Sequence, residues 1–172
     1  MRRLFLVRHA KAEPSIGQDD YTRQLTARGK EDARRVAHAL AKEDRLPELI
    51  VHSGAARTKQ TVEAFISQWD KAVAIEEEIG LYDASQDVLF QRVQALRDAQ
   101  RRVALVGHNP GIGELAWSLA GAGPRAALRH IEARFPTCSV AALDFSVESW
   151  KDVERKSAKL ALFLTPSELE ER

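Results

Sequence analysis

Short apolar runs that alternate with longer amphipathic stretches constrain the fold of this 172-residue chain more than any other feature. Several runs are apolar at successive positions, which is typical of strands buried on both faces. A chain that alternates such strands with helices favours an α/β fold with a largely parallel sheet. We expect strands at residues 4–7, 49–51, 73–75, 103–106, 140–145 and 160–164.

Apolar residues recur at helical spacing between these runs. After Thr26, an expected N-cap, one stripe extends to Leu40, and Pro47 marks the end of this helix. A later helix is expected to begin with Asn109 as N-cap and Pro110 in the first turn, and to end in glycine. Two further stripes lie between them, formed by Val62, Phe65, Ile66 and Trp69 and by Val88, Leu89, Val93 and Leu96.

Length and composition exclude several classes of protein. The length suits one domain, residues 1–172. The net charge is +1 with acids and bases interspersed, so we expect neither nucleic acid nor a membrane as partner. Cys138 is the only cysteine, which excludes a disulfide framework and a cysteine zinc site. The first apolar run breaks at Arg8, too early for a signal peptide or a membrane span, so we expect a soluble, cytoplasmic protein.

Four cationic or titratable side chains follow the ends of three expected strands. Arg8 and His9 end the first, Arg57 lies just inside the helix after the second, and His108 follows the fourth. In open α/β sheets the ligand crevice lies beyond the carboxyl ends of the strands. We therefore expect two guanidinium groups and two imidazoles to meet there.

This set of groups indicates phosphoryl transfer. Two arginines can hold phosphoryl oxygens through charged hydrogen bonds, and nearby helix N-termini add backbone donors. The chain has no metal motif and no cysteine at a strand end, so we predict a metal-independent reaction without a cofactor and with a histidine nucleophile. His9 is the expected nucleophile, and His108 is expected to hydrogen-bond a phosphoryl oxygen as charge develops.

The motifs "LVRHAKAE", "RQLTARGKEDARRVAHAL", "HSGAARTKQTVEAF" and "VGHNPGIGELA" occur in this order. They resemble four blocks of the histidine phosphatase superfamily, and the short length and "GHNPGIGEL" resemble its small bacterial phosphohistidine phosphatases of the SixA type. The resemblance implies a three-layer α/β/α sandwich, phosphoglycerate mutase-like, with a mostly parallel central sheet. It also implies that His9 becomes phosphorylated while Arg8, Arg57 and His108 bind the phosphoryl group.

Two positions depart from that family's pattern. Ala10 replaces the glycine that usually follows the histidine. Many members carry a glutamate after the third strand to protonate the leaving alkoxide, whereas "EEEIGLYDAS" offers only Asp83 near that place, as a possible general acid. An alkoxide benefits greatly from a positioned acid, but an imidazole, with a pKa of about 6.5, departs with little help. The favoured substrate is therefore phosphohistidine on a protein, and the alternative is a small phosphorylated metabolite.

Other polar residues admit simpler roles. Ser53 either hydrogen-bonds phosphate or caps a helix. His52 could line the pocket, but we expect it to have a structural or surface role. We expect His38 on the polar side of its helix and His130 in a basic loop, both solvated.

Two functions from other classes compete with phosphatase activity. The segment "GIGELA" fits a dinucleotide-binding G-x-G-x-x-A pattern, but the segment "PRAALRHI" downstream supplies no ribose-binding acid. A noncatalytic phosphate-binding module is the second rival. It would not require His9, because binding alone needs no nucleophile.

Overall fold

The structure, a computed structural model, describes residues 1–42 and 46–171. The seven strands within these described residues form one sheet in the order β3-β2-β4-β1-β6-β7-β5. β1 pairs in parallel with β4, β4 with β2 and β2 with β3, whereas β6 runs antiparallel to β1 and β7. The strands are β1 (Arg2–Arg8), β2 (Leu49–His52), β3 (Ala74–Glu77), β4 (Arg102–Gly107), β5 (Ala120–Ala122), β6 (Val140–Phe145) and β7 (Ala158–Leu164).

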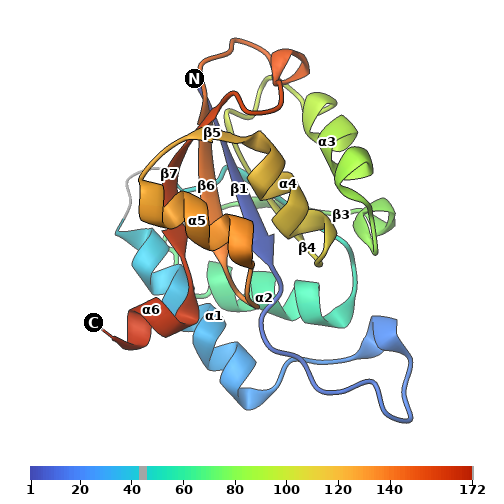
Figure 1. Cartoon of the computed structure of the whole chain (residues 1–172). Coiled ribbons are helices and arrows are strands. Elements are labelled where there is room, and N and C mark those ends of the chain that lie inside the picture. The colour runs from blue at the N-terminus through green and yellow to red at the C-terminus, as the bar shows by residue number, and fades with distance from the viewer. Residues whose placement is uncertain (43–45, 172) are drawn as a thin grey trace.

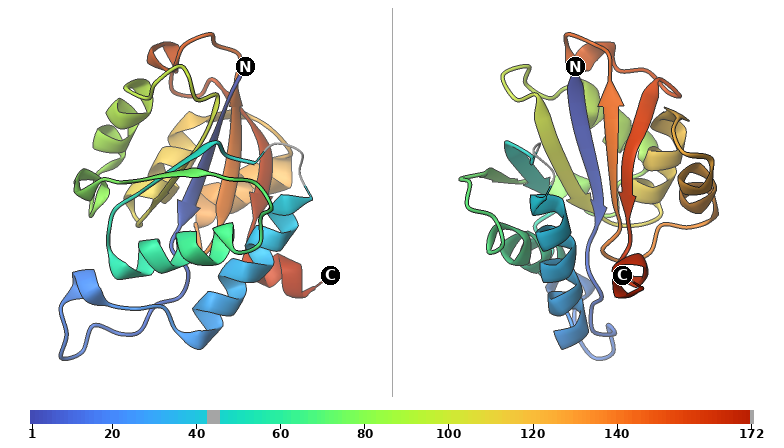
Figure 2. Two further views of the ribbon diagram at one scale, coloured as in Figure 1. Left: turned by 180° about the vertical axis from the view of Figure 1, so that it is seen from behind. Right: turned by 90° about the vertical axis from the view of Figure 1, so that its left-hand side faces the viewer.

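Helices cover both faces of the sheet, which confirms the predicted three-layer α/β/α architecture (Figure 1, Figure 2). α1 and α2 lie on one face, and α3, α4 and α5 lie on the other. Among the described residues no helix is long and apolar enough to cross a membrane. The helices are α1 (Ala27–Ala41), α2 (Ala56–Ile66), α3 (Gln86–Gln94), α4 (Gly111–Leu119), α5 (Arg125–Ala133) and α6 (Pro166–Glu170).

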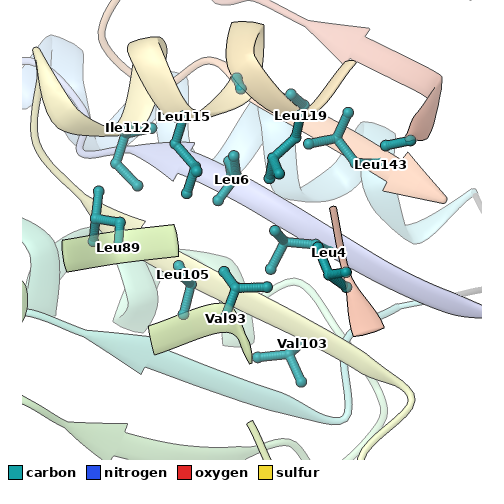
Figure 3. Close-up of a cluster of buried hydrophobic side chains, with 14 of the residues drawn as sticks. Leu4, Leu6, Leu89, Val93, Val103, Leu105, Ile112, Leu115, Leu119 and Leu143 are labelled. Carbon is teal, nitrogen blue, oxygen red and sulfur yellow. The ribbon is translucent and has the colours of Figure 1, made fainter. Parts of the chain in front are cut away.

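Side chains of β1 alternate between the two faces of the sheet and so contribute to the hydrophobic core on each face. Leu4 and Leu6 pack in the cluster beneath α3 and α4, where Leu105 and Leu115 also lie (Figure 3). Phe5 and Val7 point to the opposite face and pack against α1 and α2. Since successive strand residues face opposite sides of a sheet, a run that is apolar throughout is buried on both. Each such side chain contributes roughly 1.5–3 kcal/mol by burial, so the strand that carries the site is firmly anchored.

Two helices are shorter than their apolar stripes predict. α2 ends at Ile66, although Trp69 beyond it is buried and its Nε1 donates to the Ala37 carbonyl oxygen. α3 ends at Gln94, and Leu96 is buried outside it. The prediction that Val88 lies on the apolar stripe is wrong: it is 48% exposed, because the face of α3 that contacts the core is the one carrying Leu89 and Val93.

Helix boundaries in the C-terminal half of the chain also differ from those predicted. α4 begins at Gly111, and Asn109 lies outside it while its Oδ1 still accepts the Gly113 N–H at 3.1 Å. The expected terminal glycine does not end α4, because the chain passes directly into β5. His130 lies in α5 and not in a loop; this helix packs on the core through the buried Ile131 and the partly buried Ala127 and Leu128. Thr26 does cap α1 by accepting the Gly29 N–H, as predicted.

Candidate active site

Parallel pairing of β1 and β4 brings the two predicted histidines together. Arg8 is in register with Gly107, so His9 and His108, which follow them, lie side by side with ring centroids 5.3 Å apart. β2 ends beside β4, and the turn that follows it leads into α2, which carries Arg57. Arg8, His9, Arg57 and His108 thus line one cavity of about 330 Å³ at the carboxyl ends of the strands. The predicted meeting of four groups is what the structure shows.

His9 is a neutral imidazole with a defined tautomer. Its Nδ1 lies 2.7 Å from the Ala10 carbonyl oxygen, which can only accept a hydrogen bond, so Nδ1 carries the proton and Nε2 keeps its lone pair. Burial lowers the pKa of His9 to about 3, and the nearby charges of His108, Arg57 and Arg8 add to this effect. At neutral pH, Nε2 of His9 is therefore available as a nucleophile.

The two arginines retain unused hydrogen-bonding capacity. Arg8 donates from NH1 to the Phe135 carbonyl oxygen at 3.1 Å, and burial lowers its pKa from the ordinary value. Arg57 is 3% exposed and is held by Asp20. The Nε atoms of both guanidinium groups are buried without a partner. A buried N–H without a partner is costly, so the site suits an anion that offers several acceptor oxygens.

Asp20 is a site residue that the sequence did not identify. Arg57 donates from NH1 to its backbone carbonyl oxygen at 2.7 Å and from NH2 to its Oδ2 at 3.0 Å, and the Tyr82 hydroxyl donates to the same Oδ2 at 2.5 Å. The Tyr82 hydrogen bond and the charge of Arg57 hold the pKa of Asp20 below its usual value, so Asp20 is a carboxylate at neutral pH. Asp20 begins a short 3₁₀ helix (Asp20–Thr22) and Tyr82 follows another (Ile79–Leu81). Neither segment has a periodic pattern, which explains why no sequence signal marked the two residues.

Ser53 lies behind the cavity and not on its surface. The residue is 0% exposed, and its Oγ lies 2.7 Å from Nε2 of His108 and 3.0 Å from the Thr58 hydroxyl. Ser53 Oγ thus contacts the imidazole of His108, and the two roles expected for Ser53, binding phosphate or capping a helix, stay predictions. His52 is buried and its Nδ1 accepts the Gly54 N–H at 3.1 Å, which is a structural role.

Asp83 lines the cavity, as expected for a possible general acid. Its φ of 52° lies in the left-handed region, which aspartate tolerates better than most residues. Glu76 and Glu78 lie outside the cavity and pair with Arg97 and Arg92. The lining also includes Lys11 and four residues to which sequence reasoning gave no role in the site: Ala12, Arg23, Asn109 and Thr137.

A larger cavity, of about 520 Å³, lies between α1, β7 and α6. It lacks the paired imidazoles, and its Arg34 and Arg35 are each within ion-pair distance of Glu31. In the part of the chain that the structure describes, no group of three or more His, Cys, Asp or Glu residues could hold a metal ion. Cys138 is buried, which raises the pKa of its thiol and keeps it protonated.

The fold and the cavity lined by His9 and His108 define a phosphoryl-transfer enzyme of the α/β class. Comparison with known proteins gives its family. The model of the histidine phosphatase superfamily (branch 1) matches residues 4–85. A protein of Mycobacterium tuberculosis is 30% identical over 162 residues, covering 93% of this chain and 99% of its own length. The chain therefore belongs to the histidine phosphatase superfamily, and it is a phosphatase.

Solved structures of the same fold include two assigned as phosphohistidine phosphatase SixA. The one from Agrobacterium tumefaciens is 29% identical with a TM-score of 0.80, covering 96% of this chain and 98% of that one. The one from Nakamurella multipartitia is 27% identical with a TM-score of 0.79, covering 96% of each chain. The phosphoglycerate mutase-like fold expected from the sequence is thereby confirmed.

Proposed function

We propose that this phosphatase hydrolyses phosphohistidine on a protein, through a phosphohistidine formed at Nε2 of His9. The observation that carries the proposal is the state of His9. It is a buried, neutral imidazole whose proton is fixed on Nδ1 by the Ala10 carbonyl oxygen, and it lies in one cavity with two guanidinium groups. A pocket that only bound phosphate would need the guanidinium groups but not an oriented nucleophile.

In the first step, Nε2 of His9 attacks phosphorus and a P–N bond forms while the bond from phosphorus to the substrate imidazole breaks. Arg8 and Arg57 bind the phosphoryl oxygens, and His108 hydrogen-bonds one of them. The substrate ring departs as neutral imidazole when its second nitrogen is protonated, a state accessible near its ordinary pKa of about 6.5. The leaving group therefore needs little help from a strong acid.

In the second step, water attacks phosphorus and the bond to His9 breaks; one proton of the water stays on the inorganic phosphate and the other is released to solvent. The Ala10 carbonyl oxygen contributes here as well. Because it holds a proton on Nδ1, the phosphorylated ring already carries the positive charge that lets His9 leave as a neutral imidazole. The enzyme then returns to the tautomer in which it began.

Two observations support phosphohistidine as the substrate. Both SixA-assigned structures resemble this chain over nearly its full length. Asp20, the carboxylate nearest Arg57, is held ionised by Tyr82 and Arg57 and so cannot serve as a proton donor. The presence of Asp83 in the cavity favours a second candidate, hydrolysis of a small phosphorylated metabolite with Asp83 as the acid.

The kcat/KM ratio for a phosphohistidine protein and an alkyl phosphomonoester separates these candidates. We expect the wild-type enzyme to prefer phosphohistidine strongly, and Asp83→Asn to leave that activity unchanged, because imidazole departs without an acid. Asp70→Asn, a change at an exposed position outside the cavity, is the matched control. Efficient ester hydrolysis that is lost in Asp83→Asn but kept in Asp70→Asn would establish the metabolite phosphatase instead.

A further inference from the structure

Behind His108, on the side away from its unpartnered Nδ1, two buried hydroxyl groups form a short chain. Ser53 Oγ lies 2.7 Å from Nε2 of His108 and 3.0 Å from Thr58 Oγ1. Both hydroxyl residues are 0% exposed. Since Nε2 is occupied by Ser53, Nδ1 is the ring nitrogen that can bind a phosphoryl oxygen, and it is buried with no partner in the protein.

The proton of His108 can lie on either nitrogen, and the hydroxyl chain decides which. The Thr58 hydroxyl has one proton and two acceptors within reach, the Ala55 carbonyl oxygen at 2.9 Å and Ser53 Oγ at 3.0 Å. If Thr58 donates to Ala55, Ser53 donates to Thr58 and accepts from Nε2–H of His108. If Thr58 donates to Ser53, the Ser53 proton goes to Nε2, and the proton of His108 lies on Nδ1.

We propose that Ser53, supported by Thr58, is a positioning residue for phosphoryl transfer: it donates to Nε2 of His108, so that a neutral His108 presents Nδ1–H to the phosphoryl group. The inference rests on the proposed function, because it assigns a role in the same reaction. Switching the chain requires only rotation of two hydroxyl groups. The Ala55 carbonyl oxygen stays paired when Thr58 turns away, because it also accepts the N–H groups of Thr58 and Lys59 at 3.0 Å.

A hydroxyl suits this place better than a carboxylate does. Burial lowers the pKa of His108 to about 4; Arg57, Arg23 and Arg8 lower it further and Asp20 raises it, while the His9 ring lies 5.3 Å away and the Tyr82 ring 5.4 Å away. At neutral pH, His108 therefore has one proton to give. A carboxylate behind Nε2 could only accept and would hold that proton on the wrong nitrogen, whereas a serine can donate.

A double-mutant cycle on phosphohistidine hydrolysis tests the link between the two residues. We expect Ser53→Ala to lower kcat about tenfold to a hundredfold, and to have little further effect in the His108→Ala background, because Ser53 acts through His108. Ser67→Ala, at an exposed position on the end of α2, should change nothing. If His108→Ala is itself harmless, the role of His108 in the proposed function fails; if His108→Ala is harmful and the two effects multiply, only the role of Ser53 fails.

Nitrogen NMR of the imidazole in the wild-type enzyme gives a readout that no folding defect can disturb. With inorganic phosphate bound at neutral pH, we expect His108 to be neutral and protonated on Nδ1. In Ser53→Ala, kcat should recover toward the wild-type value as the pH falls toward 4, because imidazolium carries a proton on Nδ1 without help. A phosphate-bound wild-type His108 protonated on Nε2 alone would overturn the proposal.

Discussion

Replacing His9 by alanine is expected to lower kcat/KM for phosphohistidine by at least about a thousandfold while the protein stays folded. The substitution removes the imidazole that accepts the phosphoryl group, and the remaining arginines bind phosphate but cannot attack it. The fold should persist because β1 is anchored by apolar residues on both faces, and His9 adds to it one side-chain hydrogen bond, to a carbonyl oxygen of the next residue. Steady-state kinetics and thermal unfolding measure the two properties separately.

His38→Ala is the matched control for this experiment. His38 is exposed on α1, outside the cavity that contains His9, so its replacement should leave kcat/KM unchanged. The assignment of the nucleophile would be wrong if the His9→Ala enzyme, free of wild-type contamination, retained turnover within tenfold of wild type.

Replacing Arg57 by alanine is expected to cost about a hundredfold to a thousandfold in kcat/KM, through both a higher KM and a lower kcat. Arg57 is 3% exposed, so little water screens its charge from a phosphoryl group in the cavity, although Asp20 neutralises part of it. Arg57→Lys should recover only part of the loss, because an ammonium group keeps the charge but not the planar array of donors. Inorganic phosphate, tested as an inhibitor, should bind more weakly to both variants.

Arg57 also holds Asp20, so a second variant must separate phosphate binding from loop position. Asp20→Asn removes the carboxylate charge and leaves the Asp20 carbonyl oxygen in place as the partner of Arg57 NH1. If Arg57 acts by binding the phosphoryl group, Asp20→Asn does not reproduce the loss of kcat/KM seen in Arg57→Ala. Equal losses in the two variants would show that Arg57 acts by fixing the loop, and unchanged kinetics in Arg57→Ala would remove it from the site.

The fold was predictable where a pattern is carried by many residues. β1, β4 and β6 each contain four consecutive apolar residues, because both faces of the sheet are covered, and this signal survives without any tertiary information. β5 is a three-residue Ala-Gly-Ala strand on the sheet edge, which has no such signal. The ends of α2 and α3 also escaped prediction, because the buried residues Trp69 and Leu96 continue each apolar stripe after the helix has ended.

The site was predictable where topology alone positions a residue. Arg8, His9 and His108 lie at the ends of neighbouring parallel strands, so the sheet brings them together whatever the loops do. Asp20 contacts Arg57, and Tyr82 contacts Asp20, from two short 3₁₀ segments whose paths depend on tertiary contacts. The contact of Ser53 with His108 was not predicted, because the direction of one hydroxyl is fixed by side-chain packing and not by its place in the sequence.

The stereochemical course at phosphorus tests most directly whether the phosphoryl group passes through His9. The measurement uses a thiophosphoryl substrate made chiral with oxygen isotopes, hydrolysed by the wild-type enzyme in isotopically labelled water. Each in-line displacement inverts phosphorus. Transfer to His9 and then to water predicts overall retention of configuration, whereas overall inversion would show that water attacks the substrate directly and would contradict the covalent intermediate.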